Sequence, residues 1–403
     1  MDWKVIAWHL IFLPRIEPIH TWGVPRANYI AMKYIFLSIF SLHLVFSSVA
    51  QTGKRKVQLV ILFDTSNSMD GLLNQAKAKI WAIVNEVAKL TYQGTSPDLE
   101  IAMYDYGNQS LNIKDNYIRQ QLNFTQDLDL VSEKLFGLRT NGGDEFCGAV
   151  IQKSLSDLSW SANSTDLKLI YIAGNEPFNQ GPISYKEACA LAKTKGVLVS
   201  TIFCGPYDEG VRTFWQDGAT CSGGDFFNIN SDQAISYIAT PYDSLIQTYN
   251  FKLNGTYVSY GFSGADKKNK QVLQDDNAKT LNEAVMVERA VAKGSTYYWN
   301  GDWDLVDAVA ADSTVLTKLK AEDRTDELKG KTDEEIKILV EEKTKERQQV
   351  QKEIAALNQK RLSYIEEQSK NNNSKPDDFG TAVAKSIRKN AVHLGFDEER
   401  KNE

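Results

Sequence analysis

The stretch VQLVILFDTSNS at residues 57–68 points most directly to the fold of this chain. Residues 57–63 are almost all apolar, which is typical of a parallel strand buried on both faces. Asp64, Ser66 and Ser68 follow at alternate positions, where the strand should end and a helix should begin. Their carboxylate and hydroxyl oxygens are hard ligands of the kind that Mg²⁺ and Mn²⁺ prefer. Because open α/β sheets bind ligands outside the carboxyl ends of their strands, we expect a binding site here.

Strand and helix patterns alternate from this stretch to about residue 230. The alternation predicts a doubly wound, mostly parallel α/β sheet. We expect strands at 57–64, 99–106, 117–124, 167–173, 197–204 and 226–229. We expect helices at 72–92, 127–138, 145–158, 185–194 and 209–218, from the spacing of their apolar residues.

Residues 231–403 show little strand character and predict an α-helical C-terminal region. Helical patterning covers 276–292 and 304–311. Residues 332–335, Thr-Asp-Glu-Glu, form a capping box ahead of a long charged helix that runs to about Glu367. Charged residues interrupt the apolar seam of this helix, so a hairpin packed on the rest of the domain is favoured over a free coiled coil. A last amphipathic helix carries Val383, Ile387 and Val392.

The element order and the Asp-x-Ser-x-Ser motif resemble the von Willebrand factor type A (VWA) domain over residues 56–230. The resemblance implies a metal-ion-dependent adhesion site (MIDAS) that binds Mg²⁺ or Mn²⁺. In that family the first motif supplies one aspartate and two serines, which correspond here to Asp64, Ser66 and Ser68. A threonine in a later loop is the next ligand, which corresponds to Thr140.

The last ligand of the family is an aspartate after a buried strand, and this position reads as Gly174 in the present chain. Glu176 and Asn175 lie close along the same loop, and Glu145 follows Thr140 by a few residues. Each of the three offers an oxygen that compensates for the missing carboxylate. Glu145 and its neighbour Asp144 also stand at the start of a predicted helix, where acidic side chains serve as simple caps. The serines of the first motif have the same alternative role.

The resemblance implies a non-catalytic module of the cell envelope that binds a protein ligand through the cation. Hydroxyl ligands leave the ion under-neutralised, and Mg²⁺ keeps water in its open positions. An acidic side chain of a partner can then complete the shell. The alternative is a structural VWA scaffold whose metal site has decayed and which acts through its surface and its helical region. Neither interpretation is an enzyme.

The string at residues 142–146, Gly-Gly-Asp-Glu-Phe, matches the signature of diguanylate cyclases. In that family it forms a hairpin turn between strands of a cytoplasmic, GTP-binding domain. Here a helical apolar pattern follows it, in a chain that we expect to be exported. We therefore rank cyclase activity behind both non-catalytic interpretations.

Residues 32–50 have the pattern of a signal peptide. A basic start precedes the apolar segment 34–46, which is short for a bilayer span, and Ser48-Val49-Ala50 has the form of a cleavage signal. The pattern predicts export to the periplasm or the extracellular side, and a mature chain from Gln51 without a transmembrane span. Residues 1–31 have no clean pattern and are predicted to be a spurious upstream extension. An uncleaved signal anchor is the alternative.

Charge and histidine content exclude several classes of function. The 403 residues carry a net charge of −6 without a long basic block, so nucleic acid is not an expected partner. Residues 1–50 hold three of the four histidines, and the predicted mature chain keeps only His393. Serine–histidine triads and His-rich zinc sites are implausible in such a chain.

The even number of cysteines favours disulfides in an exported chain. The expected fold favours the pairs Cys147–Cys189 and Cys204–Cys221, because it places each pair on neighbouring elements. Free buried thiols are the alternative.

The signal-peptide prediction has a direct test. N-terminal sequencing of the exported protein should find Gln51 as the first residue, because cleavage follows the small residues at 48–50. A start well before Gln51 would contradict it.

Overall fold

The computed structural model describes residues 54–229, 238–371 and 378–397. The expectations for residues 1–53, including the signal peptide, lie outside the described residues.

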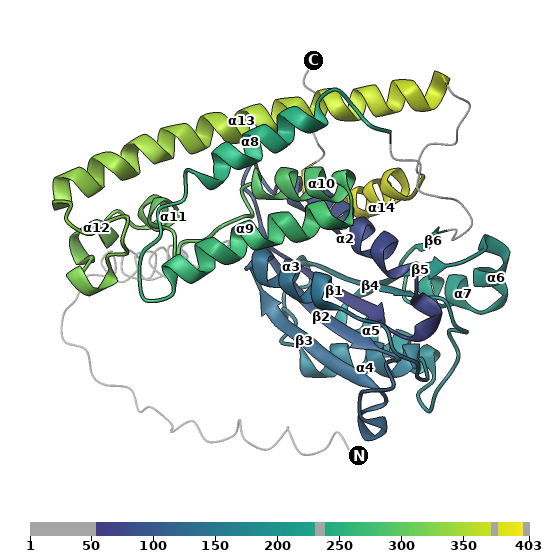
Figure 1. Ribbon diagram of the computed structural model, residues 1–403. Coiled ribbons are helices and arrows are strands. Elements are labelled where there is room, and N and C mark those ends of the chain that lie inside the picture. The colour runs from purple at the N-terminus through teal and green to yellow at the C-terminus, as the bar shows by residue number, and fades with distance from the viewer. Residues whose placement is uncertain (1–53, 230–237, 372–377, 398–403) are drawn as a thin grey trace, which may run out of the picture. The chain divides into compact units, whose positions relative to one another are not determined.

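The predicted fold class is confirmed, because a six-stranded, mostly parallel sheet carries helices and a helical region follows it (Figure 1). The strands are β1 (Lys56–Asp64), β2 (Asp98–Tyr106), β3 (Ile118–Thr125), β4 (Leu167–Gly174), β5 (Leu198–Cys204) and β6 (Phe226–Ile229). The helices beside the sheet are α2 (Leu73–Ala88), α3 (Leu128–Gly137), α4 (Cys147–Asp157), α5 (Tyr185–Lys195), α6 (Tyr207–Arg212) and α7 (Trp215–Thr220). The later helices are α8 (Asp243–Asn254), α9 (Gly264–Leu281), α10 (Glu283–Lys293), α11 (Leu305–Ala311), α12 (Val315–Lys318), α13 (Asp333–Asn371) and α14 (Asp378–His393).

The strand order β3-β2-β1-β4-β5-β6 places β1 in the middle of the sheet. β3 is antiparallel to β2, and the other neighbouring strands are parallel. The chain leaves β1 to build β2 and β3 on one side and then returns to build β4 on the other. The carboxyl ends of β1 and β4 therefore form the point where the winding reverses, which is where open α/β sheets bind ligands.

Alternate residues of β1 face two different hydrophobic cores. Leu59 and Ile61 pack on the side of α2 and α3, whereas Val60 and Leu62 pack on the side of α4 and α5. Both faces of β1 are therefore buried, which explains its unbroken apolar run. The first core also includes α8, α10, α13 and α14, so the C-terminal helices share a core with one face of the sheet.

Two predicted helices are each divided in the structure. The predicted helix at 209–218 is α6 and α7, separated at Phe214, whose φ of 69° cannot continue a right-handed helix. The predicted helix at 276–292 is part of α9 followed by α10, because Asn282 takes an extended conformation and accepts a hydrogen bond from the N–H of Val285 as the cap of α10. The capping box before α13 is confirmed by reciprocal hydrogen bonds between Thr332 and Glu335.

The favoured disulfide pairing is wrong. The structure joins Cys189 on α5 to Cys221 after α7 and leaves Cys147 and Cys204 as buried free thiols. Cys204 lies in the core on the α2 side of the sheet, whereas Cys221 packs on the α5 side, so the sheet separates them. Cys147 lies instead beside the hydroxyl of Tyr106, with the two atoms 3.7 Å apart.

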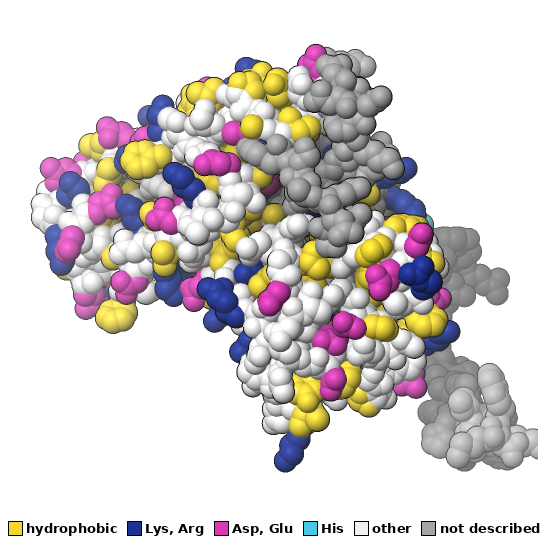
Figure 2. Space-filling view, turned by 45° about the vertical axis from the view of Figure 1, so that its right-hand side comes forward, with side chains coloured by type: hydrophobic (Ala, Val, Ile, Leu, Met, Phe, Trp, Pro, Cys, Tyr) yellow, Lys and Arg dark blue, Asp and Glu magenta, His cyan; other side chains and the backbone are white. Residues whose placement is uncertain are grey.

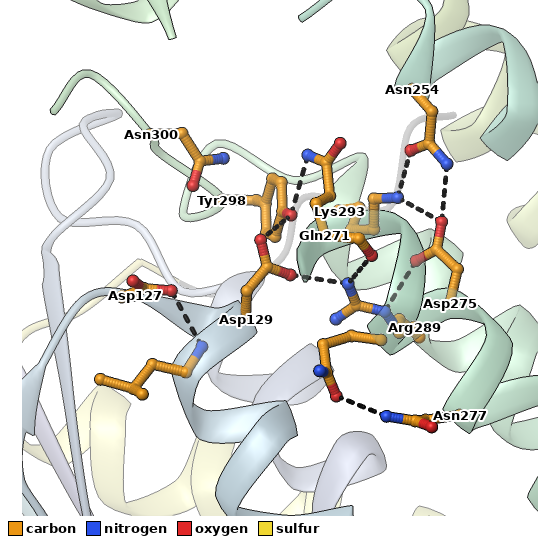
Figure 3. Close-up of polar contacts among 12 residues, drawn as sticks. Asp127, Asp129, Asn254, Gln271, Asp275, Asn277, Arg289, Lys293, Tyr298 and Asn300 are labelled. Atoms are coloured by element: carbon orange, nitrogen blue, oxygen red, sulfur yellow. Dashed lines mark hydrogen bonds and ion pairs between the residues drawn. The ribbon is translucent and has the colours of Figure 1, made fainter. Parts of the chain in front are cut away.

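A buried ionic network joins the C-terminal helices to α3 (Figure 3). The guanidinium of Arg289 donates to Asp129 Oδ1 of α3 at 2.6 Å and to Asp275 Oδ1 of α9 at 2.8 Å. Lys293 Nζ donates to the other oxygen of Asp275 at 2.7 Å, and the Tyr298 hydroxyl donates to Asp129 Oδ2 at 2.6 Å. The two cations balance the two anions, which is the condition for burying charges without a large desolvation loss.

The surface shows no sign of a concentrated basic face on the side drawn in Figure 2, where Lys and Arg side chains lie among Asp and Glu side chains. None of the helices in the described ranges combines the length and the apolar character that crossing a membrane requires.

We expect Arg289→Met to lower the free energy of unfolding by roughly 3–5 kcal/mol, because it leaves Asp129 and Asp275 short of a buried cation. Urea unfolding followed by circular dichroism measures the change. Lys329→Met is the control, because it removes an exposed ion pair with Asp326 and should leave the free energy of unfolding nearly unchanged. Equal effects of the two substitutions would show that the network does not hold the helices in place.

Candidate functional site

Asp64 ends β1 and has no solvent exposure. Its Oδ1 accepts a hydrogen bond from the backbone N–H of Ser66 at 2.8 Å, but its Oδ2 is buried without a hydrogen-bond partner among the described residues. Burial raises the pKa of Asp64 to about 7, and the charge of Glu176 raises it further, against the opposing effects of Ser66 and of the backbone N–H of Asn175. A buried carboxylate oxygen without a partner costs free energy, so Oδ2 marks a place where a ligand would be stabilising.

The structure brings Ser66, Ser68 and Asn175 together. The two serine hydroxyls lie 2.8 Å apart, and Ser68 Oγ donates to Asn175 Oδ1 at 2.9 Å. Asn175 Nδ2 donates in turn to the backbone oxygen of Ser68 at 3.3 Å. Ser66 stands before a 3₁₀ turn, Asn67–Met69, and makes no side-chain capping hydrogen bond there. The capping alternative for Ser66 is therefore not what the structure shows.

The loop that carries Thr140 lies against the first motif. The backbone N–H of Asn141 donates to the oxygen of Thr65 at 3.0 Å, and the side chain of Asn108 donates to the same oxygen at 3.4 Å. The hydroxyl of Thr140 donates to the carboxylate of Asp70. Thr140 thus contacts the far end of the motif loop, and its predicted role as a metal ligand stays a prediction.

Two glycines bring Glu145 to the same place as Asp64. A Cβ atom on Gly143 would lie 2.3 Å from the backbone oxygen of Gly107, so only a glycine permits this close approach of the two loops. A Cβ atom on Gly107 would lie 2.9 Å from Glu145 Cγ and 3.0 Å from Asp64 Oδ1. The two acidic side chains therefore converge above Gly107, and Glu145 is only 6% exposed.

Glu145 does not serve as a helix cap. Helix α4 begins at Cys147, its N-cap residue is Phe146, and no side chain caps it. The expectation that Asp144 acts as the cap is therefore wrong, and so is the same alternative for Glu145. Burial raises the pKa of Glu145 to about 8, and the negative charge of Asp64 adds to this effect.

Gly174 has no room for a side chain. A Cβ atom there would lie 2.7 Å from the hydroxyl of Tyr106 and 3.0 Å from both Asp64 Oδ2 and Trp215 Cη2. Tyr106 is held in place because its hydroxyl donates to the backbone oxygen of Ala173 at 3.1 Å. The departure from the family pattern at position 174 is therefore accompanied by large side chains that fill the space.

An open pocket of about 430 Å³ begins at this site. Ser68, Asn175 and Glu176 form one wall, and Pro206, Glu209 and Thr213 of the α6 region form another. In the part of the chain that the structure describes, no group of three or more His, Cys, Asp or Glu side chains converges as metal ligands. A cation here would therefore depend on hydroxyl, amide and water oxygens in addition to carboxylates.

The sequence interpretation missed several residues that shape the site: Asp70, Tyr106, Gly107 and Asn108. Tyr106, Gly107 and Asn108 end β2 and begin the loop after it, at the same carboxyl edge of the sheet as Asp64. The signal that could have found this loop is the predicted strand 99–106, because its carboxyl end lies at the same edge of a parallel sheet as Asp64.

The comparisons with known proteins add a fold likeness. No family model matches the chain, and no curated relative is found. Similar solved structures include BatB from Bacteroides thetaiotaomicron, at 17% identity over 43% of this chain and 90% of that chain, with a TM-score of 0.34. The SpRpn10 VWA domain matches at 15% identity over 44% of this chain and 90% of its own, with a TM-score of 0.33. An aerotolerance-related membrane protein from Bacteroides fragilis matches at 17% identity, over 44% and 93%, with a TM-score of 0.29. The structural neighbours thus include VWA domains, but scores this low carry no argument about function.

The pKa values of Asp64 and Glu145 predict how stability depends on pH without divalent cations. In the folded chain both pKa values are raised above the ordinary values of 3.8 and 4.5. As the pH rises, the two carboxyl groups therefore lose their protons in the unfolded chain before they lose them in the folded chain. The free energy of unfolding should therefore fall between about pH 4 and about pH 8. Asp64→Asn removes one of these titrating groups. As the pH rises from about 5 to about 8, its free energy of unfolding should therefore increase relative to that of the wild type by on the order of 2 kcal/mol.

Urea unfolding in EDTA at several pH values measures this difference. Glu209→Gln, which changes an exposed carboxylate at the pocket rim, is the control and should follow the wild-type curve. Parallel curves for wild type and Asp64→Asn would contradict the assignment.

Proposed function

We propose that this chain is a non-catalytic, divalent-cation-dependent protein-binding module of the cell envelope. The observation that carries the proposal is Asp64 Oδ2, a fully buried carboxylate oxygen with no hydrogen-bond partner among the described residues. Asp64 lies at the reversal point of the sheet and directly before the loop that carries the hydroxyls of Ser66 and Ser68, and a cation would supply the missing interaction. Asp64, Ser66, Ser68 and Thr140 are the proposed ligands of Mg²⁺ or Mn²⁺.

The donor set suits a hard cation. One carboxylate, several hydroxyls and the amide oxygen of Asn175 are oxygen donors, which Mg²⁺ and Mn²⁺ prefer over nitrogen or sulfur. Ser68 is exposed and also lines the pocket, so the site is open to solvent on one side. A side chain from a partner protein can enter from that side and complete the shell.

The acidic surroundings give a reason for cation dependence. Glu176 and Glu209 line the pocket, and Asp64 and Glu145 lie behind it. Like charges brought together across an interface cost several kcal/mol, so an acidic side chain is repelled while no cation is present. A bound divalent ion attracts an acidic side chain of the partner that reaches it, and this attraction replaces the repulsion at that point. The proposed partner group is therefore a carboxylate that binds when the cation is present.

The proposed location follows from the signal-peptide pattern at residues 32–50, which predicts export to the periplasm or the extracellular side.

A structural scaffold with a decayed metal site is the second candidate. The observation in its favour is that the hydroxyls already have partners within the chain: Ser66 with Ser68, Ser68 with Asn175, and Thr140 with Asp70. In that case the chain acts through its surface and its helical region, and a cation has no effect on it.

Titration with Mg²⁺ or Mn²⁺ separates the two candidates. A bound cation should raise the free energy of unfolding by about 2.7 kcal/mol at a hundredfold excess over its dissociation constant. Asp64→Asn should abolish this response, and Glu209→Gln should keep it. Proteins that co-purify with the wild-type chain in Mg²⁺ should be released by EDTA and absent with Asp64→Asn. An unfolding curve of the wild type that does not respond to either cation would favour the scaffold.

A further inference from the structure

We propose that Glu145 supplies the second carboxylate of this cation site, in place of the acidic residue that position 174 cannot hold. The inference rests on the proposed function and names the residue that completes the ligand set. It depends on three observations: how the chain satisfies its other buried acids, how Glu145 reaches Asp64, and why Gly174 excludes a side chain.

Within the described ranges, most other buried aspartates have cationic partners. Asp105 pairs with Arg119, Asp243 with Arg361, and Asp304 with Arg347. Asp129 and Asp275 share the network of Arg289 and Lys293. Buried Asp166 has no such ion pair and is satisfied by hydrogen bonds from Ser161, Asn163 and the backbone of Lys56.

Asp64 and Glu145 depart from this rule. Both are buried and lie close together, yet within the described ranges no Lys or Arg forms an ion pair with either. Two adjacent carboxylates without a counter-charge repel one another and are poorly solvated. A cation bound between them provides the counter-charge that arginine or lysine provides elsewhere in the chain.

The backbone is built to deliver Glu145 to this position. Gly107 has a φ of 76°, which favours glycine, and a side chain there would occupy the space where Glu145 and Asp64 meet. Gly143 lets the Glu145 loop run directly against the backbone of Gly107. The hydrogen bond between Asn141 and Thr65 holds the start of the same loop against the first motif. These contacts explain the two glycines of the 142–146 string without reference to a nucleotide.

The opposite side of Asp64 is closed. Tyr106 and Trp215 occupy the space that a side chain at position 174 would need. The Nε1–H of Trp215 donates to the backbone oxygen of Glu176 at 2.8 Å, which fixes the ring against this loop. A second carboxylate can therefore reach Asp64 from the Glu145 loop but not from position 174. With Glu145 as a ligand, the protein supplies two negative charges to a doubly charged ion.

Isothermal titration of the mature chain with Mn²⁺ tests the assignment, with the Mn²⁺ electron paramagnetic resonance spectrum as a second readout. Glu145→Gln keeps the shape of the side chain and should weaken Mn²⁺ binding on the order of tenfold or more. Glu176→Gln tests the other candidate for the second carboxylate, which also lines the pocket, and it should change the affinity less than about threefold. Glu145→Asp, which keeps the charge but shortens the reach, should fall between wild type and Glu145→Gln.

The outcomes distinguish this inference from the proposed function. Loss of binding in Asp64→Asn with wild-type affinity in Glu145→Gln overturns the role of Glu145 alone. Equal weakening by Glu145→Gln and Glu176→Gln also overturns it, because a general loss of negative charge then explains both. Absence of Mn²⁺ binding to the wild-type chain, or binding that Asp64→Asn leaves unchanged, overturns the proposed function and this inference together.

Discussion

The buried carboxylate at the end of the central strand is the constraint on which the rest of the site depends. β1 is buried on both faces, so its last residue, Asp64, cannot reach solvent without disrupting the two cores that cover the strand. Loss of hydration disfavours the charged form of a carboxyl group. Oδ1 accepts a hydrogen bond from the backbone N–H of Ser66, whereas Oδ2 has no hydrogen-bond partner among the described side chains. Glu145 approaches the carboxyl group of Asp64 on the side of Oδ1, whereas Oδ2 faces Gly174, and the serine hydroxyls follow directly in the chain.

The chain contains two kinds of buried polar cluster, and the difference between them is informative. The cluster around Arg289 is electrically balanced, and its charged groups are hydrogen-bonded to one another between α3, α9 and α10, so they need no counter-charge from outside. The cluster around Asp64 and Glu145 contains two acidic groups without a counter-charge and sits at an edge that opens into a pocket. Burial without a counter-charge persists at functional sites because the surrounding structure holds it there. Within the described residues, the same sequence that pairs most of its other buried aspartates with arginine or lysine leaves these two without a cation at the reversal point of the sheet.

Sequence reasoning succeeded where a local pattern determines the structure. The apolar run of β1, the order of the strands along the chain and the capping box of Thr332 and Glu335 all depend on neighbouring residues, and each was predicted correctly. It failed where residues distant in the chain decide the outcome. The disulfide depends on which face of the sheet each cysteine occupies, and a shift of one position along β5 moves a side chain to the other face. The burial of Glu145 depends on the contact of Gly143 with Gly107, which no local pattern in the 142–146 string reveals.

The helical region supports the site from behind. Helix α2 follows the first motif directly, and α10 and α14 pack against it, with Asn85 of α2 donating to the backbone oxygen of Glu288 at 3.1 Å. Helix α3 leads into the Thr140 loop, and α9 packs against it. Lys77 of α2 joins α2 to the end of α3, because its ammonium donates to the backbone oxygen of Leu138 at 3.2 Å.

The loops at the site therefore extend from helices whose outer faces are already covered by the C-terminal helices. Rigid support of this kind holds ligands to within fractions of an ångström, which a cation with strict geometry such as Mg²⁺ requires. Within the described residues, the shared core therefore makes the C-terminal helices part of what positions the site, although they contribute none of its proposed ligands.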